Sequence, residues 1–115
     1  MDSSADLALM FKALGDKTRV QILDFLRDRC SPVAVGEEGD VHLIDGPSVG
    51  EVCCHITGKD KINSTISFHI NELRDAGLIH VERRGKYMIC GVNRVALARL
   101  ADYLNHDSKI SEECC

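Results

Sequence analysis

Side chains that can hydrogen-bond to nucleic acid are concentrated between residues 63 and 74. Hydroxyl, carboxamide, imidazole and guanidinium groups contact the phosphates and base edges of DNA, and a phenylalanine ring can lie against a thymine methyl group. The residues concerned are Asn63, Ser64, Thr65, Ser67, Phe68, His69, Asn71 and Arg74. The pattern predicts a surface that reads double-stranded DNA, although polar residues on a helix are often only solvated.

A basic group follows at Arg83, Arg84 and Lys86, beside Gly85. Positive side chains at the tip of a hairpin suit a phosphate backbone or the minor groove of DNA. Basic hairpin tips are common on protein surfaces, so this group alone is weak support for DNA binding. Because it comes directly after residues 63–74, the two groups together are a much stronger signal.

Cysteine supplies the third reactive set, at Cys30, Cys53, Cys54, Cys90, Cys114 and Cys115. Structural disulfides are disfavoured in a small cytoplasmic protein, which points to metal, metalloid or redox chemistry. Cys53 lies on the apolar stripe of its helix, so burial as a small hydrophobe and a ligand role are equally supported. Cys54 is turned about 100° from that stripe and has no packing role. Cys90 alternates with apolar residues on a strand, which favours core packing, and Cys30 stays unassigned.

The last two thiols, Cys114 and Cys115, end a polar segment, residues 106–115, that is expected to be a flexible tail. Such a tail spans up to about 33 to 36 Å when extended, enough to reach Cys53 and Cys54. These four cysteines are therefore the candidate metal site, although redox chemistry remains open. Thiolate-only coordination suits the soft ions Cd(II), Pb(II), Cu(I) and Zn(II), or the metalloids As(III) and Sb(III). No organic cofactor is expected.

A helix is needed to present the polar residues of the first group. Ile66, Ile70 and Leu73 fall within one arc at the helical period, so the polar side chains between them project from the opposite side. Asn63 or Ser64 can cap the first turn by accepting a backbone hydrogen bond. One face of this helix is predicted to pack and the other to read DNA.

A two-stranded wing is predicted directly after this helix. Gly77 permits a left-handed helix stop, and residues 78–82 and 86–92 have the pattern of short strands. Residues 83–85 are expected to form the tight turn between them, where Gly85 supplies the conformational freedom.

The remaining elements are mostly helical. Apolar periodicity predicts helices over residues 5–14, from Asp16 or Thr18 to about residue 29, over 48–56, and from Val95 onward with a stripe formed by Leu97, Leu100, Ala101 and Leu104. Residues 30–47 contain two prolines and three glycines and are predicted to be an inserted loop, with 41–44 as a short edge strand. The fold class is thus α+β, mainly helical: a winged helix-turn-helix of about five helices and a two-stranded β wing.

Bulk composition sets the limits of this interpretation. The chain has 115 residues, of which 44% are hydrophobic, so residues 1–115 suit a single domain. No apolar run approaches the ~20 residues needed to cross a bilayer, and the protein is expected to be cytoplasmic, without a membrane partner.

The net charge is −4, whereas residues 59–86 carry six basic and four acidic side chains. Weak attraction to DNA overall predicts that two copies bind two half-sites together.

Three segments carry a family resemblance: ALGDKTRVQIL at 13–23, STISFHINELRDAGLI at 64–79 and RRGKYMICGVN at 83–93. They resemble the ArsR/SmtB metalloregulatory repressors in order and spacing. The resemblance implies a homodimeric winged-helix repressor that leaves its operator when an inducer binds, with the first and last helices at the dimer seam. It also favours As(III) or Sb(III) as the inducer.

The sequence departs from the family pattern in three places. The loop at 30–47 is longer than usual, and the family's Cys-x-Cys arsenic motif would fall near Ser48 and Gly50 rather than at Cys53 and Cys54. The family's zinc site on the last helix is represented only by Asp102 and His106. A zinc site of that type is therefore not predicted.

Two alternatives remain beside an ion-released repressor. The same fold could sense oxidation through disulfide formation, or a thiol-rich metal carrier could use the winged helix only for protein contacts. The histidines and carboxylates are scattered, without nucleophile, base and orienting roles that can be assigned. An enzyme is therefore not expected.

Overall fold

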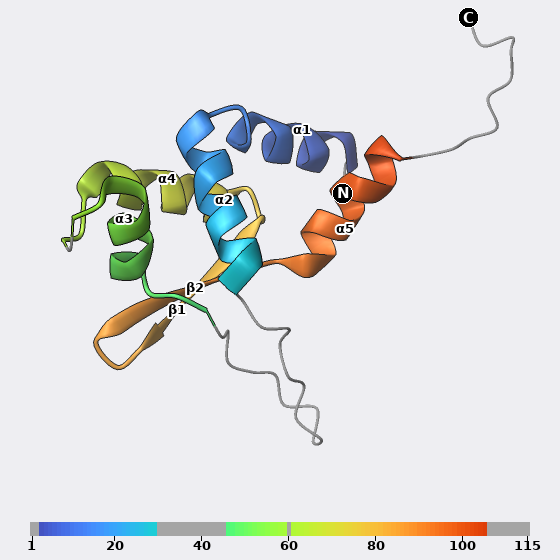
Figure 1. Cartoon of the computed structure of the whole chain (residues 1–115). Coiled ribbons are helices and arrows are strands. Elements are labelled where there is room, and N and C mark those ends of the chain that lie inside the picture. Colours follow the sequence, from blue (N-terminus) through green and yellow to red (C-terminus); the bar gives the residue numbers. More distant parts are fainter. Residues whose placement is uncertain (1–2, 30–45, 60, 106–115) are drawn as a thin grey trace, which may run out of the picture.

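The computed structural model describes residues 3–29, 46–59 and 61–105, which form five helices and a two-stranded sheet (Figure 1). The elements are α1 (Ser3–Ala13), α2 (Lys17–Arg29), α3 (Val49–Thr57), α4 (Ser64–Asp75), β1 (Ile79–Arg84), β2 (Tyr87–Val92) and α5 (Arg94–Leu104). This order confirms the predicted winged helix-turn-helix. The edge strand expected at 41–44 and the tail at 106–115 lie outside the described residues.

Helix α2 lies at the centre of the domain and contacts α3, α4 and β2. Its side chains Ile22 and Leu26 are fully buried, together with Leu73 of α4 and Leu78 after it. The Phe25 ring stacks on the His55 ring of α3 with centroids 4.1 Å apart. Removing this apolar surface from water fixes α3 and α4 relative to one another, and so fixes the polar face of α4 in space.

Local capping signals define both ends of the helix-turn-helix. Ser48 and Glu51 form a reciprocal capping box at the start of α3, which ends at Gly58 with φ of 78°. The Asn63 side chain caps α4 by accepting hydrogen bonds from the Thr65 and Ile66 backbone N–H groups at 2.8 and 3.1 Å. Gly77, with φ of 82°, gives the expected left-handed stop.

Replacing Asn63 with alanine is expected to lower the free energy of unfolding by about 0.5–2 kcal/mol, the usual effect of losing an N-cap acceptor. Urea denaturation followed by circular dichroism measures the change. Asn63→Asp keeps a side-chain oxygen at the cap and should retain most of the stability. Equal losses for the two variants would contradict a capping role.

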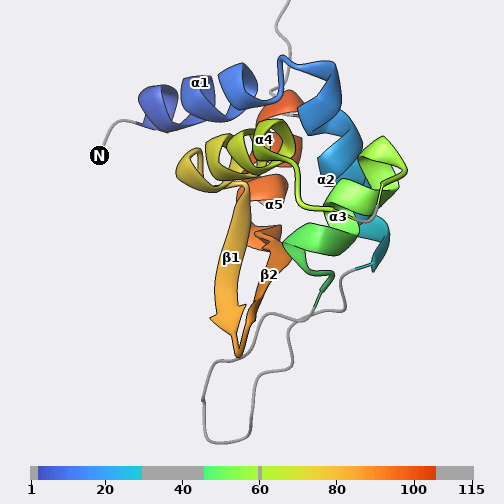
Figure 2. The ribbon, with the colours of Figure 1, turned by 90° about the vertical axis from the view of Figure 1, so that its left-hand side faces the viewer.

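The wing is an antiparallel hairpin in which Ile79 pairs with Val92 and Arg84 pairs with Tyr87. The turn therefore consists of Gly85 and Lys86, and the prediction that Arg83 and Arg84 form the turn is wrong. Gly85 has φ of 65° and occupies the first position of the two-residue turn. This geometry lets the strand pairing continue through both arginines. Figure 2 shows the hairpin extending away from the helices.

The segment before α3 also reaches this sheet. Ser48 forms an isolated antiparallel bridge with Ile89, and the Cys90 N–H donates to the Pro47 carbonyl at 2.8 Å. The contact fixes the start of α3 against β2. It therefore positions one wall of the space between the helix-turn-helix and the wing.

Helix α5 is joined to the end of α4 through one side chain. Asn93 caps α5 by accepting from the Ala96 N–H at 3.2 Å, while its Nδ2 donates to the Gly77 carbonyl at 2.8 Å. Helices α1 and α5 lie near one another (Figure 1), with the Phe11 and Tyr103 ring centroids 5.8 Å apart. Leu100 of the predicted apolar stripe is buried, whereas Leu104 is 70% exposed.

Candidate nucleic-acid interface

The outward face of α4 carries most of the predicted DNA contacts. Ile66, Ile70 and Leu73 are buried in the core, as the helical period predicts. The opposite face exposes Ser64, Thr65, Phe68, Asn71 and Arg74, while Ser67 is half-buried. Phe68 is 54% exposed, so its ring is available for contact with a partner surface. The helix thus brings hydroxyl, carboxamide, guanidinium and aromatic groups together on one exposed strip.

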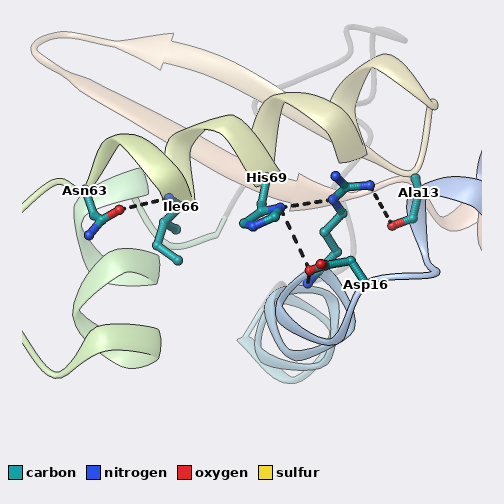
Figure 3. Close-up of polar contacts among 6 residues, drawn as sticks. Ala13, Asp16, Asn63, Ile66 and His69 are labelled. Carbon is teal, nitrogen blue, oxygen red and sulfur yellow. Dashed lines mark hydrogen bonds and ion pairs between the residues drawn. The ribbon is translucent and has the colours of Figure 1, made fainter.

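His69 is placed differently from its neighbours on α4 (Figure 3). Its side chain is only 14% exposed, and its Nδ1 accepts a hydrogen bond from Arg19 Nε at 3.0 Å. The same nitrogen lies 3.9 Å from the Asp16 carboxylate, and Arg19 Nη1 donates to the Ala13 carbonyl at 3.4 Å. His69 therefore attaches α4 to the corner between α1 and α2. Because its side chain is mostly buried, His69 does not belong to the exposed strip of α4, and its predicted contact with DNA stays a prediction.

Arg19 and Asp16 are positioning residues that the sequence interpretation missed. Asp16 accepts the Arg19 backbone N–H at 3.2 Å in the first turn of α2, which orients the arginine. The guanidinium carbon also lies 5.9 Å from the centre of the Phe68 ring. Fifty positions separate Arg19 from His69, so no local periodicity could reveal the contact. Both residues do fall within one of the segments that carry the family resemblance.

The wing presents its basic groups beyond the helices. Arg83 and Lys86 are exposed, and Arg84 is half-buried. Arg83 Nε donates to the Gly85 carbonyl at 3.2 Å, and the Lys86 ammonium lies 5.8 Å from the centre of the Tyr87 ring. These contacts hold two positive charges at the hairpin tip, where a phosphate backbone would pass if α4 lies in a major groove.

The neighbouring thiols of α3 have opposite environments. Cys53 is fully buried, and its sulfur accepts a hydrogen bond from the Asn63 backbone N–H at 3.4 Å. Cys54 is exposed, and Cys90 is buried in the core as predicted. The burial of Cys53 agrees with the packing interpretation and leaves its ligand role untested. Its sulfur also links α3 directly to the residue that caps α4.

A complete soft-metal site is not formed by the described residues. Among residues 3–29, 46–59 and 61–105, no group of three His, Cys, Asp or Glu side chains could hold a metal ion. Cys53 and Cys54 supply two thiols that diverge from one helix, so a third ligand would have to come from elsewhere. Cys114 and Cys115, predicted for that purpose, and Cys30 lie outside the described residues.

Comparisons with known proteins agree with this arrangement. No family model matches the chain. The HTH-type transcriptional regulator YbzH of Bacillus subtilis, itself uncharacterised, is 38% identical over 96 residues, which cover 83% of this chain and 91% of YbzH. This chain is thus related to a transcriptional regulator over nearly the whole length of that regulator.

Solved structures with the same fold extend the comparison. An ArsR-like transcriptional regulator from Rhodococcus sp. RHA1 superposes with a TM-score of 0.65 at 22% identity, covering 90% of this chain and 80% of that one. A possible transcriptional regulator for arsenical resistance gives 0.58 at 20% identity, with coverages of 88% and 84%. A homodimeric winged helix-turn-helix DNA-binding domain from Mycobacterium bovis gives 0.56 at 20% identity, with coverages of 93% and 89%.

Proposed function

We propose that this chain, which belongs to the HTH-type transcriptional regulators, is a homodimeric repressor of the ArsR family that is released from its operator when its thiolates capture As(III) or Sb(III). DNA binding follows from the family and from the exposed strip on α4. The inducer, the direction of regulation and the thiol ligands are the proposal. Cd(II), Pb(II), Zn(II) and Cu(I) are the alternative ions.

The contact between Cys53 and Asn63 is the observation that carries this proposal. The Cys53 sulfur accepts the N–H of the residue that caps the reading helix. A ligand that draws this sulfur away would remove the contact and disturb the first turn of α4, which holds Ser64 and Thr65. DNA binding and thiol capture would then oppose one another through one hydrogen bond.

Cys53 and Cys54 can hold a soft ion only if a thiol from residues 106–115 also binds it. Cys54 is exposed and accessible, whereas Cys53 must leave the core to become a ligand. We assign the remaining ligand position to Cys114 or Cys115, because a trivalent metalloid bound only by thiolates takes three sulfurs. Support for arsenic comes from the structural similarity to a possible regulator for arsenical resistance.

Fluorescence anisotropy on DNA from the protein's own promoter region tests this function. Reduced protein should bind the DNA, and one of the ions As(III), Sb(III), Cd(II), Pb(II), Zn(II) and Cu(I) should release it at near-stoichiometric concentration. Failure to bind any promoter DNA would reject the repressor in favour of a thiol-rich metal carrier. Release by peroxide but by no ion would identify a redox switch instead.

Dimerisation is proposed through α1 and α5. These helices expose Leu9, Val95, Tyr103 and Leu104, an apolar surface that a two-fold interface would cover. Light scattering coupled to gel filtration should show a dimer at micromolar concentration, and Leu104→Glu should shift it toward monomer. Ile62→Glu, which changes an exposed apolar residue outside both helices, is the matched control. A monomeric wild-type chain would contradict the arrangement.

No helix in the described part of the chain has the length and apolar character to span a membrane.

A further inference from the structure

A groove of about 690 Å³ lies between α3, α4 and the wing. Its apolar wall is formed by side chains from all three elements and from the turn before α4: Val49, Ile62, Ile70, Val81, Tyr87 and Met88. The volume falls within the range of about 300–1,000 Å³ that is typical of sites for small organic ligands. Such sites combine apolar walls with a few oriented polar groups, which is also the composition here.

The charged groups of the groove favour an anion. Arg74 and Lys86 lie on its lining, where Arg74 also pairs with the exposed Asp75 carboxylate at 3.2 Å, and α3 begins there at Val49 and Gly50. The first N–H groups of a helix have no partner within the helix, and its dipole favours negative charge at this end. The carboxylate of Glu51 also lines the groove and keeps its negative charge, although its Oε1 accepts the Ser48 N–H at 2.8 Å. The Glu51 N–H donates to Ser48 Oγ at 3.1 Å, so the N–H groups of Val49 and Gly50 are the candidate donors to a ligand. The groove thus has an apolar body with positive groups at its edges.

The groove also overlaps the surface that would contact DNA. Ser67, Asn71, Arg74 and Lys86 belong both to its lining and to the predicted DNA contacts. A sugar–phosphate backbone could use the cationic groups, but it has no apolar body to cover six hydrophobic side chains. A small amphipathic molecule satisfies both parts of the lining and would occupy the place of the DNA.

We propose that this groove binds a small organic anion with an aromatic or aliphatic body, of the aromatic carboxylate class, in direct competition with operator DNA. The carboxylate would pair with Arg74 or Lys86 at an edge of the groove, and the apolar body would lie against Ile70, Val81 and Met88. This inference rests on the DNA-binding function proposed above and adds an inducer site that requires no thiol.

Naphthalene-1-carboxylate is a suitable probe for testing the site by NMR. Titration into the ¹⁵N-labelled full chain should shift the amide signals of the groove-lining residues and leave those of α1 and α5 in place. Met88→Glu puts a carboxylate into the groove and should weaken probe binding about tenfold or more, because an unpaired charge beside a bound anion is costly. His80→Glu adds the same charge to an exposed position of the wing outside the groove lining and should have little effect.

A second variant keeps the test valid if Met88→Glu does not fold. Ile62→Glu changes a side chain that is 63% exposed at the groove edge, so it should fold and still weaken probe binding. Shifts that map to the α1–α5 surface, or no shifts at all, would overturn the proposal. If the groove signals respond to DNA but not to the probe, the groove belongs to the DNA interface alone.

Competition is measured with the same probe by fluorescence anisotropy on promoter DNA. At a probe concentration about ten times its dissociation constant, the apparent dissociation constant for DNA should rise about 11-fold. Groove binding without this rise would overturn the competitive role. Absence of DNA binding before any probe is added would instead reject the proposed repressor, and the NMR titration would still decide whether the groove binds the anion.

Discussion

Replacing Asn71 with alanine is expected to cause the largest loss of operator affinity among single changes on α4. The carboxamide is exposed at the middle of the reading face, and asparagine can donate to and accept from one adenine edge at the same time. A contact of this kind contributes about 1–3 kcal/mol, which is about 5- to 150-fold in affinity. A dimer loses it in both half-sites, so the expected loss is the square of that factor. Anisotropy at one fixed salt concentration measures it.

The matched control for Asn71→Ala is Gln21→Ala. Gln21 also carries an exposed carboxamide, but it lies on α2 in the depression between α2 and α3. Operator affinity should stay within about twofold of wild type, since surface changes away from an interface usually alter free energies by less than about 0.5 kcal/mol. A folded Asn71→Ala variant that binds as tightly as the wild type would show that α4 reads DNA through other residues.

Replacing Cys54 with serine should abolish release from DNA by the metalloid while sparing DNA binding. Coupling between two ligands is typically 1–3 kcal/mol, so the wild-type protein should lose about 5- to 150-fold in DNA affinity when the ion is added. The exposed Cys54 thiol is accessible as a ligand without unfolding, and serine preserves its size without its affinity for soft ions. Anisotropy with and without As(III) gives both affinities.

Cys53 and Cys90 provide the comparisons for that experiment. Cys53→Ser should also abolish release, but its hydroxyl can still accept the Asn63 N–H, so the cap of α4 is retained. Cys90→Ala removes a buried thiol of β2 that is not among the proposed ligands and leaves the backbone hydrogen bond from the Cys90 N–H to Pro47 in place, so release should persist. Continued release from the double variant Cys53→Ser/Cys54→Ser would remove both cysteines from the mechanism.

The helices and their caps could be predicted because their signals are local. Apolar spacing identified the buried face of α4, and the short polar side chain of Asn63 and the missing Cβ of Gly77 identified its two ends. The wing was predicted in place, but its turn was predicted at residues 83–85, whereas it lies at Gly85 and Lys86. Strand propensity does not reveal whether arginine pairs across the hairpin; that depends on the turn geometry that Gly85 allows.

Contacts between distant segments could not be predicted from the sequence. The hydrogen bond from Arg19 to His69 depends on how α2 crosses α4, and no spacing within either helix encodes it. The Cys53 sulfur likewise meets Asn63 only because the turn folds back over ten residues. The sequence therefore identified the chemical groups, whereas tertiary packing decides which of them face DNA and which hold the reading helix in place.

Asn93 connects the end of α4 to α5, and this connection bears on the spacing of the operator half-sites. Its Oδ1 accepts the Ala96 N–H in the first turn of α5, and its Nδ2 donates to the carbonyl of Gly77, just after α4. If α5 forms the dimer seam, any change in the angle at which two subunits meet is passed through this amide to both reading helices. Half-sites on DNA recur at about 34–36 Å, one helical turn. The tolerance of the repressor for an inserted base pair would then depend on the stiffness of this side-chain link and of the backbone hydrogen bond from the Asn93 N–H to the Leu78 carbonyl at 2.9 Å.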